Sequence, residues 1–248
     1  MLNIKQYLDS TYLKTAAQAG LDDAANEAVV RGFVKEAIEE KFKLVMIRPD
    51  MVAIARSMVD TAKSDLKIGT VIDFPAGNAP LDAKLKEAAK AIEDGADELD
   101  FVCDYNAFKN GETALVREQV QKCTELGLMH HKVVKWIIEI AALNNQQIIQ
   151  MSALIKNCIL SNFPEEAYPS VFVKSSTGFY ETAEGVPNGA TIPGISMMIE
   201  NSFPLPVKAA GGVRTYDEAV AMIRLGVKRI GTSSAKAIAD GGIADSNY

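Results

Sequence analysis

The chain has 248 residues, of which 48% are hydrophobic, so it can bury a full core without disulfides or a partner chain. Its formal net charge of −6 argues against a nucleic-acid or anionic-membrane binder, because phosphate backbones and acidic lipids recruit basic surfaces. The three cysteines form no paired motif, no apolar signal core opens the chain, and no segment reaches the ~20 apolar residues of a membrane span. We therefore expect a cytoplasmic protein that is neither exported nor membrane-bound.

Eight short apolar runs recur along the chain, separated by amphipathic segments rich in Ala, Lys and Glu. In chain order they are Asp9–Leu13, Phe42–Ile47, Lys67–Ile72, Glu98–Val102, Val133–Ile138, Ser170–Lys174, Pro206–Ala210 and Val227–Thr232. Strands alternating with helices, eight times in about 250 residues, predict an α/β fold, a TIM (β/α)8 barrel formed by residues 1–248 as a single domain. No GxGxxG follows the first run and no GxxxxGK[ST] occurs, so the dinucleotide-binding and P-loop folds lose their usual support.

Two segments between the runs carry no predicted chemistry. The longest irregular stretch, 161–169, is expected to be a loop on the bottom face of the barrel. The only histidines, His130 and His131, are adjacent and so point to different faces of any helix or strand. We expect a solvated turn there, and no metal site, because a metal needs converging ligands.

Two lysines lie at or near the C-terminal ends of predicted strands. Lys174 ends the sixth run and precedes Ser-Ser-Thr-Gly, and Lys208 lies in the seventh run ahead of Ala-Ala-Gly-Gly. Alternate side chains of a barrel strand point inward, so both amines are expected to point into the mouth of the barrel. Neighbouring strands lie roughly 4.8 Å apart, so like charge and desolvation would lower the pKa of one lysine well below its unperturbed ~10.4. A neutral amine of this kind can attack a carbonyl carbon.

Asp100 supplies a candidate acid or base beside these lysines. It lies between Leu99 and Phe101, and alternation turns these two toward the helices and Asp100 inward. A buried carboxylate needs cations beside it, and Lys174 and Lys208 are the obvious candidates. Lys135 is a third strand lysine, but it comes earlier in its run, so we expect a structural ion pair deeper in the barrel.

Two glycine clusters follow the last two strands. Gly211 and Gly212 precede a capping box that begins at Thr215, and 231–234, with the sequence Gly-Thr-Ser-Ser, leads into the last helix. Either cluster alone is also typical of a tight turn. The loops after strands seven and eight commonly hold phosphate in TIM barrels, so together they indicate a phosphate site.

Four segments resemble the signature segments of the deoxyribose-phosphate aldolase family, namely 73–77, 95–100, 174–179 and 207–215. The resemblance runs in order from Asp9 to Ser234. It implies that Lys174 is the Schiff-base lysine and that Asp100 and Lys208 are the proton-transfer pair. It further implies a sugar-phosphate site lined by Thr177, Gly178, Phe179, Gly211, Gly212, Ser233 and Ser234, with a supporting network of Asp9 and Thr11, to which we add Lys135. Phe179 stands where some members carry a lysine, so its role would fall to its backbone N–H.

The function predicted from this resemblance is class I aldolase cleavage of 2-deoxy-D-ribose 5-phosphate to D-glyceraldehyde 3-phosphate and acetaldehyde. No metal or other cofactor is expected, because the iminium itself acts as the electron sink. The resemblance also implies a homodimer. Two alternatives stay open, another Schiff-base aldolase or transaldolase-like barrel acting on a different sugar phosphate, and a non-catalytic phosphosugar-binding barrel. The tail 241–248, which ends in Tyr248, is either a mobile lid over the site or a frayed terminus.

Overall fold

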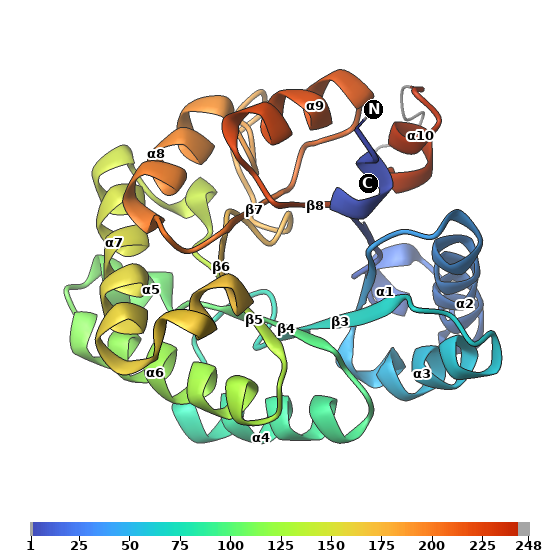
Figure 1. The fold of residues 1–248 in the computed structure, drawn as a ribbon, viewed down its shortest axis with the longest axis horizontal. Helices are drawn as coiled ribbons and strands as arrows, with labels where there is room; N and C mark the ends of the chain where they lie inside the picture. The colour runs from blue at the N-terminus through green and yellow to red at the C-terminus, as the bar shows by residue number, and fades with distance from the viewer. Residues whose placement is uncertain (1, 243–248) are drawn as a thin grey trace.

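The computed structural model describes residues 2–242 and contains a closed barrel of parallel strands in chain order (Figure 1). The strands are β1 Leu8–Thr11, β2 Leu44–Ile47, β3 Lys67–Ile72, β4 Glu98–Val102, β5 Val133–Ile137, β6 Val171–Lys174, β7 Val207–Ala210 and β8 Arg229–Thr232. β8 pairs with β1 and closes the barrel. The predicted TIM barrel is confirmed, and β3 and β4 match their predicted runs from end to end.

Helices surround the barrel on its outside (Figure 1). They are α1 Ala16–Ala19, α2 Asp23–Glu40, α3 Val52–Thr61, α4 Leu81–Glu93, α5 Tyr105–Lys109, α6 Thr113–Met129, α7 Asn145–Asn162, α8 Ile192–Ser202, α9 Tyr216–Leu225 and α10 Ala235–Ala239, with 3-10 helices η1 Ile4–Tyr7, η2 Pro49–Met51, η3 Ile140–Ala142 and η4 Glu165–Ser170. The predicted capping box is present at the start of α9. The Thr215 hydroxyl accepts from the N–H of Glu218, whose carboxylate accepts from the N–H of Thr215.

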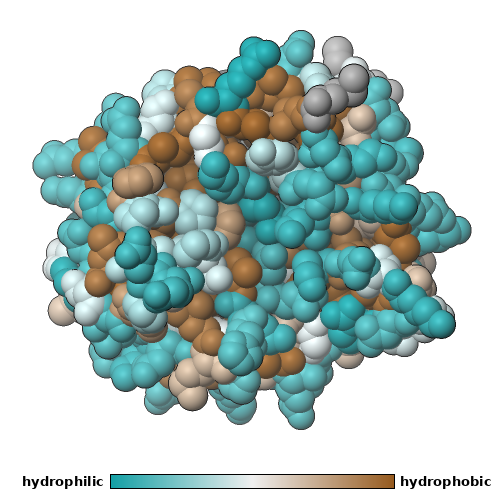
Figure 2. Space-filling model, in the orientation of Figure 1, coloured by the Kyte–Doolittle hydropathy of each residue, from teal (hydrophilic) through white to brown (hydrophobic). Residues whose placement is uncertain are grey.

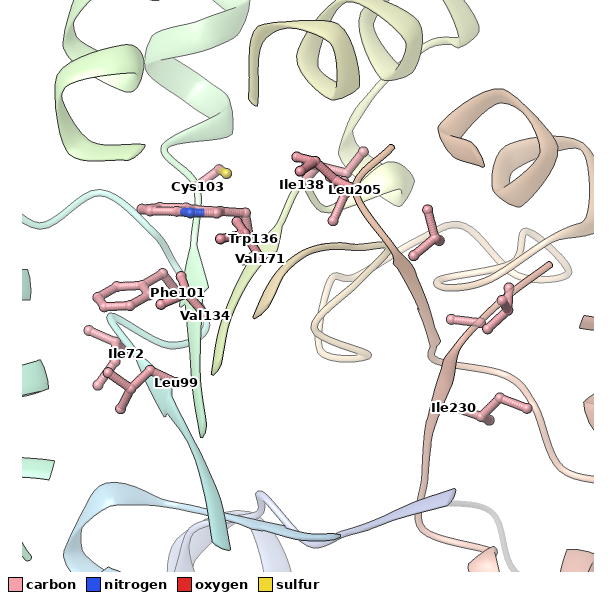
Figure 3. Close-up of a cluster of buried hydrophobic side chains, with 14 of the residues drawn as sticks. Ile72, Leu99, Phe101, Cys103, Val134, Trp136, Ile138, Val171, Leu205 and Ile230 are labelled. Carbon is pink, nitrogen blue, oxygen red and sulfur yellow. The ribbon is translucent and has the colours of Figure 1, made fainter. Parts of the chain in front are cut away.

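The outward side chains of the strands form the main hydrophobic core against the helices. Phe101 on β4 and Trp136 on β5 stack with ring centroids 5.1 Å apart (Figure 3). The Trp136 indole N–H donates to the hydroxyl of Thr124 on α6, so the buried ring keeps its polar atom satisfied. Because Leu99 and Phe101 point into this layer, Asp100 between them must point to the barrel interior.

The segment 161–169 leads into the N-terminal end of β6, at the bottom face of the barrel, as expected, but the expectation that it is a loop is wrong. α7 continues to Asn162, and η4 fills most of the remainder. Pro164 and Pro169 suggested a loop, but a proline can precede or join a short 3-10 helix, because few N–H groups are needed there. The long irregular connection is instead 175–191, between β6 and α8, at the end of the barrel where strand C-termini gather.

Three smaller expectations concern the surface and the chain end. His130 and His131 lie in an exposed turn that ends α6, as predicted. Within residues 2–242, no helix is long and apolar enough to cross a membrane. Figure 2 shows the face viewed in Figure 1 as mainly hydrophilic, with hydrophobic atoms gathered over α8 and α9. The two readings of the tail depend on residues 243–248, including Tyr248, which lie outside the described residues.

Candidate active site

The carboxylate of Asp100 is the meeting point of three lysines. Its Oδ2 atom lies 2.9 Å from Lys174 Nζ and 3.0 Å from Lys208 Nζ, and its Oδ1 atom lies 2.6 Å from Lys135 Nζ. Strand register produces this arrangement, because Lys174 pairs with Lys208 and Asp100 pairs with Lys135 across neighbouring strands. All four side chains are at most 3% exposed. The chain therefore brings the predicted catalytic residues together.

Lys135 is closer to this chemistry than its early position in β5 suggested. It forms the expected ion pair in the barrel, with Glu98 Oε2 at 2.6 Å, but it also contacts Asp100. Asp9 lies 2.7 Å from Lys208 Nζ and 2.6 Å from Arg229, so it joins the same network. These contacts make Asp9 and Lys135 supports of Asp100, Lys174 and Lys208.

Burial and charge act differently on Lys174 and Asp100. Burial lowers the pKa of Lys174 to about 8, because a desolvated ammonium is disfavoured; Asp100 opposes this change and Lys208 adds to it. Burial alone would raise the pKa of Asp100, yet attraction to Lys135, Lys174 and Lys208 holds that pKa well below its usual range. One carboxylate shared among three cations thus stays ionised and leaves Lys174 partly neutral near neutral pH.

A cavity opens above Lys174 at the C-terminal end of the barrel. Its walls include the predicted Thr11, Thr177, Gly178, Phe179, Gly211, Gly212 and Ser233. The Thr11 hydroxyl also donates to the carbonyl of Asp9 at 2.8 Å. Ser234 does not line this cavity. Its backbone N–H donates to Thr232 Oγ1 and its residue begins the turn into α10, so Ser233 faces the opening instead.

Close approach of two backbones shapes the glycine-rich wall. Gly211 and Gly212 have φ of 80° and 82°, a region that glycine adopts without a steric penalty. A Cβ atom on Gly211 would lie 2.9 Å from the Cα of Gly189 in the 175–191 connection. The Ala190 N–H donates to the Gly211 carbonyl at 2.9 Å and fixes this contact. Two exposed backbone turns of this kind suit an anionic ligand.

The backbone role expected for Phe179 meets a competing bond. Its N–H donates to Thr177 Oγ1 at 3.0 Å, so that group is already engaged. Its ring packs edge-to-face on Phe74 with centroids 5.1 Å apart, and the Arg48 guanidinium lies over the Phe74 ring at 4.8 Å. Phe179 therefore contributes an apolar wall of the cavity.

The sequence interpretation missed Glu139, which follows β5. This carboxyl is 1% exposed, and burial raises its pKa although it accepts bonds from the N–H and hydroxyl of Thr177. Its φ of 54° is unusual for a residue with a side chain. The residue thereby ties the loop after β6 to the end of β5. A glutamate after an apolar run was visible, but its unusual backbone was not.

Asn188 and Arg214 also line the cavity without having been predicted. Asn188 belongs to the 175–191 connection, and its side-chain amide donates to the Gly178 carbonyl. Arg214 lies two residues after Gly212 and brings a cation to the same wall. The resemblance already covered Arg214 within 207–215, so a charged residue after Gly-Gly was the available signal.

Comparisons with known proteins identify the family to which this barrel belongs. The model of DeoC/LacD family aldolases matches residues 13–240. The deoxyribose-phosphate aldolase of Thermococcus gammatolerans is 36% identical over 241 residues, which cover 97% of this chain and 96% of that protein. The one from Streptococcus gordonii is 35% identical over 248 residues, the full length of both. Among solved structures, the aldolase QR15 superposes with a TM-score of 0.80 at 29% identity, covering 97% of this chain and 96% of that one. A tetrameric deoxyribose phosphate aldolase from Aeropyrum pernix gives 0.76 at 27% identity, covering 96% and 89%.

The family match covers the barrel from just after β1 to the end of α10. Full-length relatives above 30% identity carry the aldolase name, so the predicted aldolase activity is confirmed and the non-catalytic alternative is set aside. The chain belongs to the DeoC/LacD family of aldolases.

Proposed function

We propose that this aldolase reversibly cleaves 2-deoxy-D-ribose 5-phosphate to D-glyceraldehyde 3-phosphate and acetaldehyde through a Schiff base on Lys174. The observation that carries the proposal is a buried lysine amine at the floor of an open cavity, 2.9 Å from a carboxylate, with its pKa lowered to about 8 by burial. The substrate is supported by the deoxyribose-phosphate aldolase name of the full-length relatives.

Covalent catalysis begins with the neutral amine. Lys174 Nζ adds to C1 of the open-chain aldehyde, and the carbinolamine loses water to give an iminium. The iminium draws electrons from the C2–C3 bond. That bond breaks as the C3 hydroxyl loses its proton, C3 becomes the aldehyde carbon of D-glyceraldehyde 3-phosphate, and C1 and C2 stay on the lysine as an enamine. Protonation of C2 and addition of water then release acetaldehyde and restore the amine.

Asp100 and Lys208 are the proposed proton-transfer pair for these steps. Their side chains are 3.0 Å apart, and Asp100 also contacts the reacting nitrogen of Lys174, so a proton can pass among the three groups or through a water between them. Lys208 also touches Asp9 at 2.7 Å, which orients its amine. The register pairing of Lys174 with Lys208 keeps both amines at one height in the barrel.

The glycine-rich wall is the proposed phosphate site. Gly211 and Gly212 carry the left-handed backbone of an anion-binding turn, Ser233 offers a hydroxyl, and Arg214 adds a cation beside them. Gly178 also lines this cavity with Lys174. A sugar whose 5-phosphate sits on this wall directs its other end, the C1 aldehyde, toward the lysine.

Borohydride trapping tests this proposal. The protein is incubated with deoxyribose 5-phosphate and borohydride, and the reduced adduct is mapped by mass spectrometry. We expect a two-carbon or sugar adduct on Lys174, no adduct and no cleavage for Lys174→Met, and a rate reduced about 10²–10⁴-fold for Lys208→Met. An adduct on a different lysine would contradict the assignment. Parallel assays with fructose 1,6-bisphosphate separate this substrate from that of another Schiff-base aldolase.

A homodimer is the proposed assembly. The hydrophobic atoms gathered over α8 and α9 in Figure 2 support self-association, and the related enzyme from Aeropyrum pernix is tetrameric. Light scattering of the purified protein measures the state directly, and a mass of one chain at micromolar concentration would contradict the dimer.

The cytosol is the proposed compartment. Cys103, Cys123 and Cys158 are all buried as free thiols, which is typical of proteins kept in a reducing environment. Fractionation of the source cells, followed by detection of the protein, tests this placement.

A further inference from the structure

The charged side chains inside the barrel form a closed ring of alternating sign. Going round it, the carboxylates and cations are separated by 3.0, 2.7, 2.6, 3.1, 2.6 and 2.6 Å, in the order Asp100–Lys208–Asp9–Arg229–Glu98–Lys135–Asp100. Its members come from β1, β4, β5, β7 and β8, and each is at most 5% exposed. Every acid in the ring touches two bases, and every base touches two acids.

Counting charges separates Lys174 from the other bases. The ring holds three carboxylates and three cations, so it is neutral when all six groups are ionised. Within residues 2–242, Lys174 forms one ion pair, with Asp100, which the ring already shares with two other lysines. A proton on Lys174 therefore adds an uncompensated charge to a buried site, which is strongly disfavoured.

The other groups that face Lys174 do not change this balance. Asp100 on β4, Lys135 on β5 and Lys208 on β7 already belong to the ring. Glu139 after β5 also attracts Lys174, but burial raises the pKa of this carboxyl, which favours its neutral form, and within residues 2–242 it forms no ion pair with the lysine. β2 and β3 contribute apolar side chains to the interior. The pKa values of Lys135 and Arg229 are raised while that of Lys174 is lowered, although burial alone would lower all three. For these three groups, the two that belong to the ring have raised pKa values and the one outside it has a lowered pKa.

We propose that this ring causes the one proton that the network releases near neutral pH to leave from Lys174, and that Glu98 and Arg229 are positioning residues that tune the nucleophile from the far end of the barrel. Glu98 and Arg229 are the first residues of β4 and β8, and neither lines the substrate cavity. They act through charge alone. The proposal rests on the Schiff-base role proposed above for Lys174.

Removing one charge from the ring tests the proposal. Arg229→Gln leaves the ring with one excess negative charge, which stabilises protonated Lys174. The acidic limb of the kcat/KM profile should therefore move up by roughly one pH unit, the effect of a unit charge about 10 Å away at an effective dielectric constant of ~20. At pH values below the limb, kcat/KM should fall about tenfold. Glu98→Gln should move the limb down, and the double variant Glu98→Gln/Arg229→Gln, with the ring neutral again, should return it close to the wild-type position.

Two features keep this test decisive. Arg56→Gln is the matched control, because Arg56 also bridges two carboxylates, Asp60 and Asp97, but lies outside the barrel, and its profile should not move.

The pH dependence of borohydride trapping at Lys174 is measured alongside kcat/KM. If wild-type protein forms no Lys174 adduct, the proposed function fails. If the adduct forms and the Arg229→Gln and Glu98→Gln profiles stay with the wild type, or if the double variant shifts as far as a single one, only the ring proposal is overturned. If Arg229→Gln fails to fold, the shift of the Glu98→Gln profile tests the ring proposal by itself.

Discussion

The barrel interior has two halves, one lined by apolar side chains and the other by charged side chains. Toward β2 and β3 the inward side chains are apolar, with Leu44, Met46 and Val71 packed against Leu13. Gly69 leaves room for them, since a Cβ atom there would lie 2.6 Å from the Met46 side chain. Across the interior, the remaining strands carry the charged ring and Lys174. Both halves are buried, and in both the inward side chains alternate with outward ones along each strand. Alternation alone therefore does not decide whether the inward side chains are apolar or charged.

The difference between the halves is best explained by chemistry. Replacing buried ion pairs by well-packed apolar side chains is often neutral or stabilising, so the charged half gains little stability over the apolar one. What the charged half provides is a carboxylate that stays ionised beside a lysine that can lose its proton. The apolar half also favours the neutral amine of Lys174. Its side chains on β2 and β3 exclude water from the interior, and the loss of water lowers the pKa of the lysine.

Placing a charge in the apolar half should produce the largest effect. Met46 is fully buried, and its cluster partners are apolar, so the carboxylate of Met46→Glu would lack a cation. We expect a loss of at least about 4 kcal/mol in the free energy of unfolding, or failure to fold. Urea denaturation measures the loss. Met46→Leu, which keeps volume and polarity, should cost less than about 1.5 kcal/mol. Equal stability of the two variants would mean that the halves tolerate charge alike.

Removing a charge from the opposite half should have the next largest effect. Asp100→Asn deprives three lysines of their shared counterion, and breaking a buried ion pair in this way costs about 3–5 kcal/mol. The folded-state pKa of Asp100 lies below its unfolded value, so its contribution is present above about pH 4 and is lost as pH falls through the folded pKa. The difference in the free energy of unfolding between the wild type and Asp100→Asn should therefore decrease at acidic pH. Denaturation at pH 7 and pH 3 measures this, with the exposed Asp65→Asn as control.

Much of the fold and the central site could be read from sequence because each strand carries its own pattern. Alternation within 98–102 was enough to turn Asp100 inward, and the position of Lys174 at a strand end placed it at the mouth. Glu98 and Arg229 also stand out in the sequence, because each is a charged residue within a predicted strand. Glu98 also shares a face with Asp100, two residues later. What no local pattern gives is that the two side chains meet, 131 positions apart, because this depends on how the barrel closes.

Loop geometry set the other limit of prediction. Ser233 and Ser234 were both expected in the substrate site, but after the turn at Thr232 only Ser233 lines the cavity. The position of the Glu139 side chain depends on a left-handed backbone, which cannot be predicted from a glutamate in the sequence. Both cases lie just beyond a strand end, where the period-two pattern stops and single torsion angles decide which side chain faces the ligand.

Removing Lys174 itself should give a smaller effect of opposite sign. In Lys174→Met the ring stays complete and neutral, while a buried ammonium with no counterion of its own is replaced by an apolar chain of similar length. We expect the inactive variant to be more stable than the wild type by about 1–3 kcal/mol at pH 7, measured by thermal and urea unfolding. The control is Lys84→Met, because Lys84 is equally buried but bonds to the carbonyls of Gly77 and Val102, and its loss should destabilise.

The pH dependence of that gain distinguishes desolvation from better packing. Lys174 has a folded-state pKa of about 8 against 10.5 for an unperturbed lysine, so between these values the unfolded chain holds a proton that the folded protein has lost. Wild-type stability should therefore rise relative to that of Lys174→Met across this range, and the advantage of the variant should shrink toward zero. A gain that stays constant from pH 7 to pH 10.5 would assign it to packing, and the lysine would then not be the strained member of the charged half.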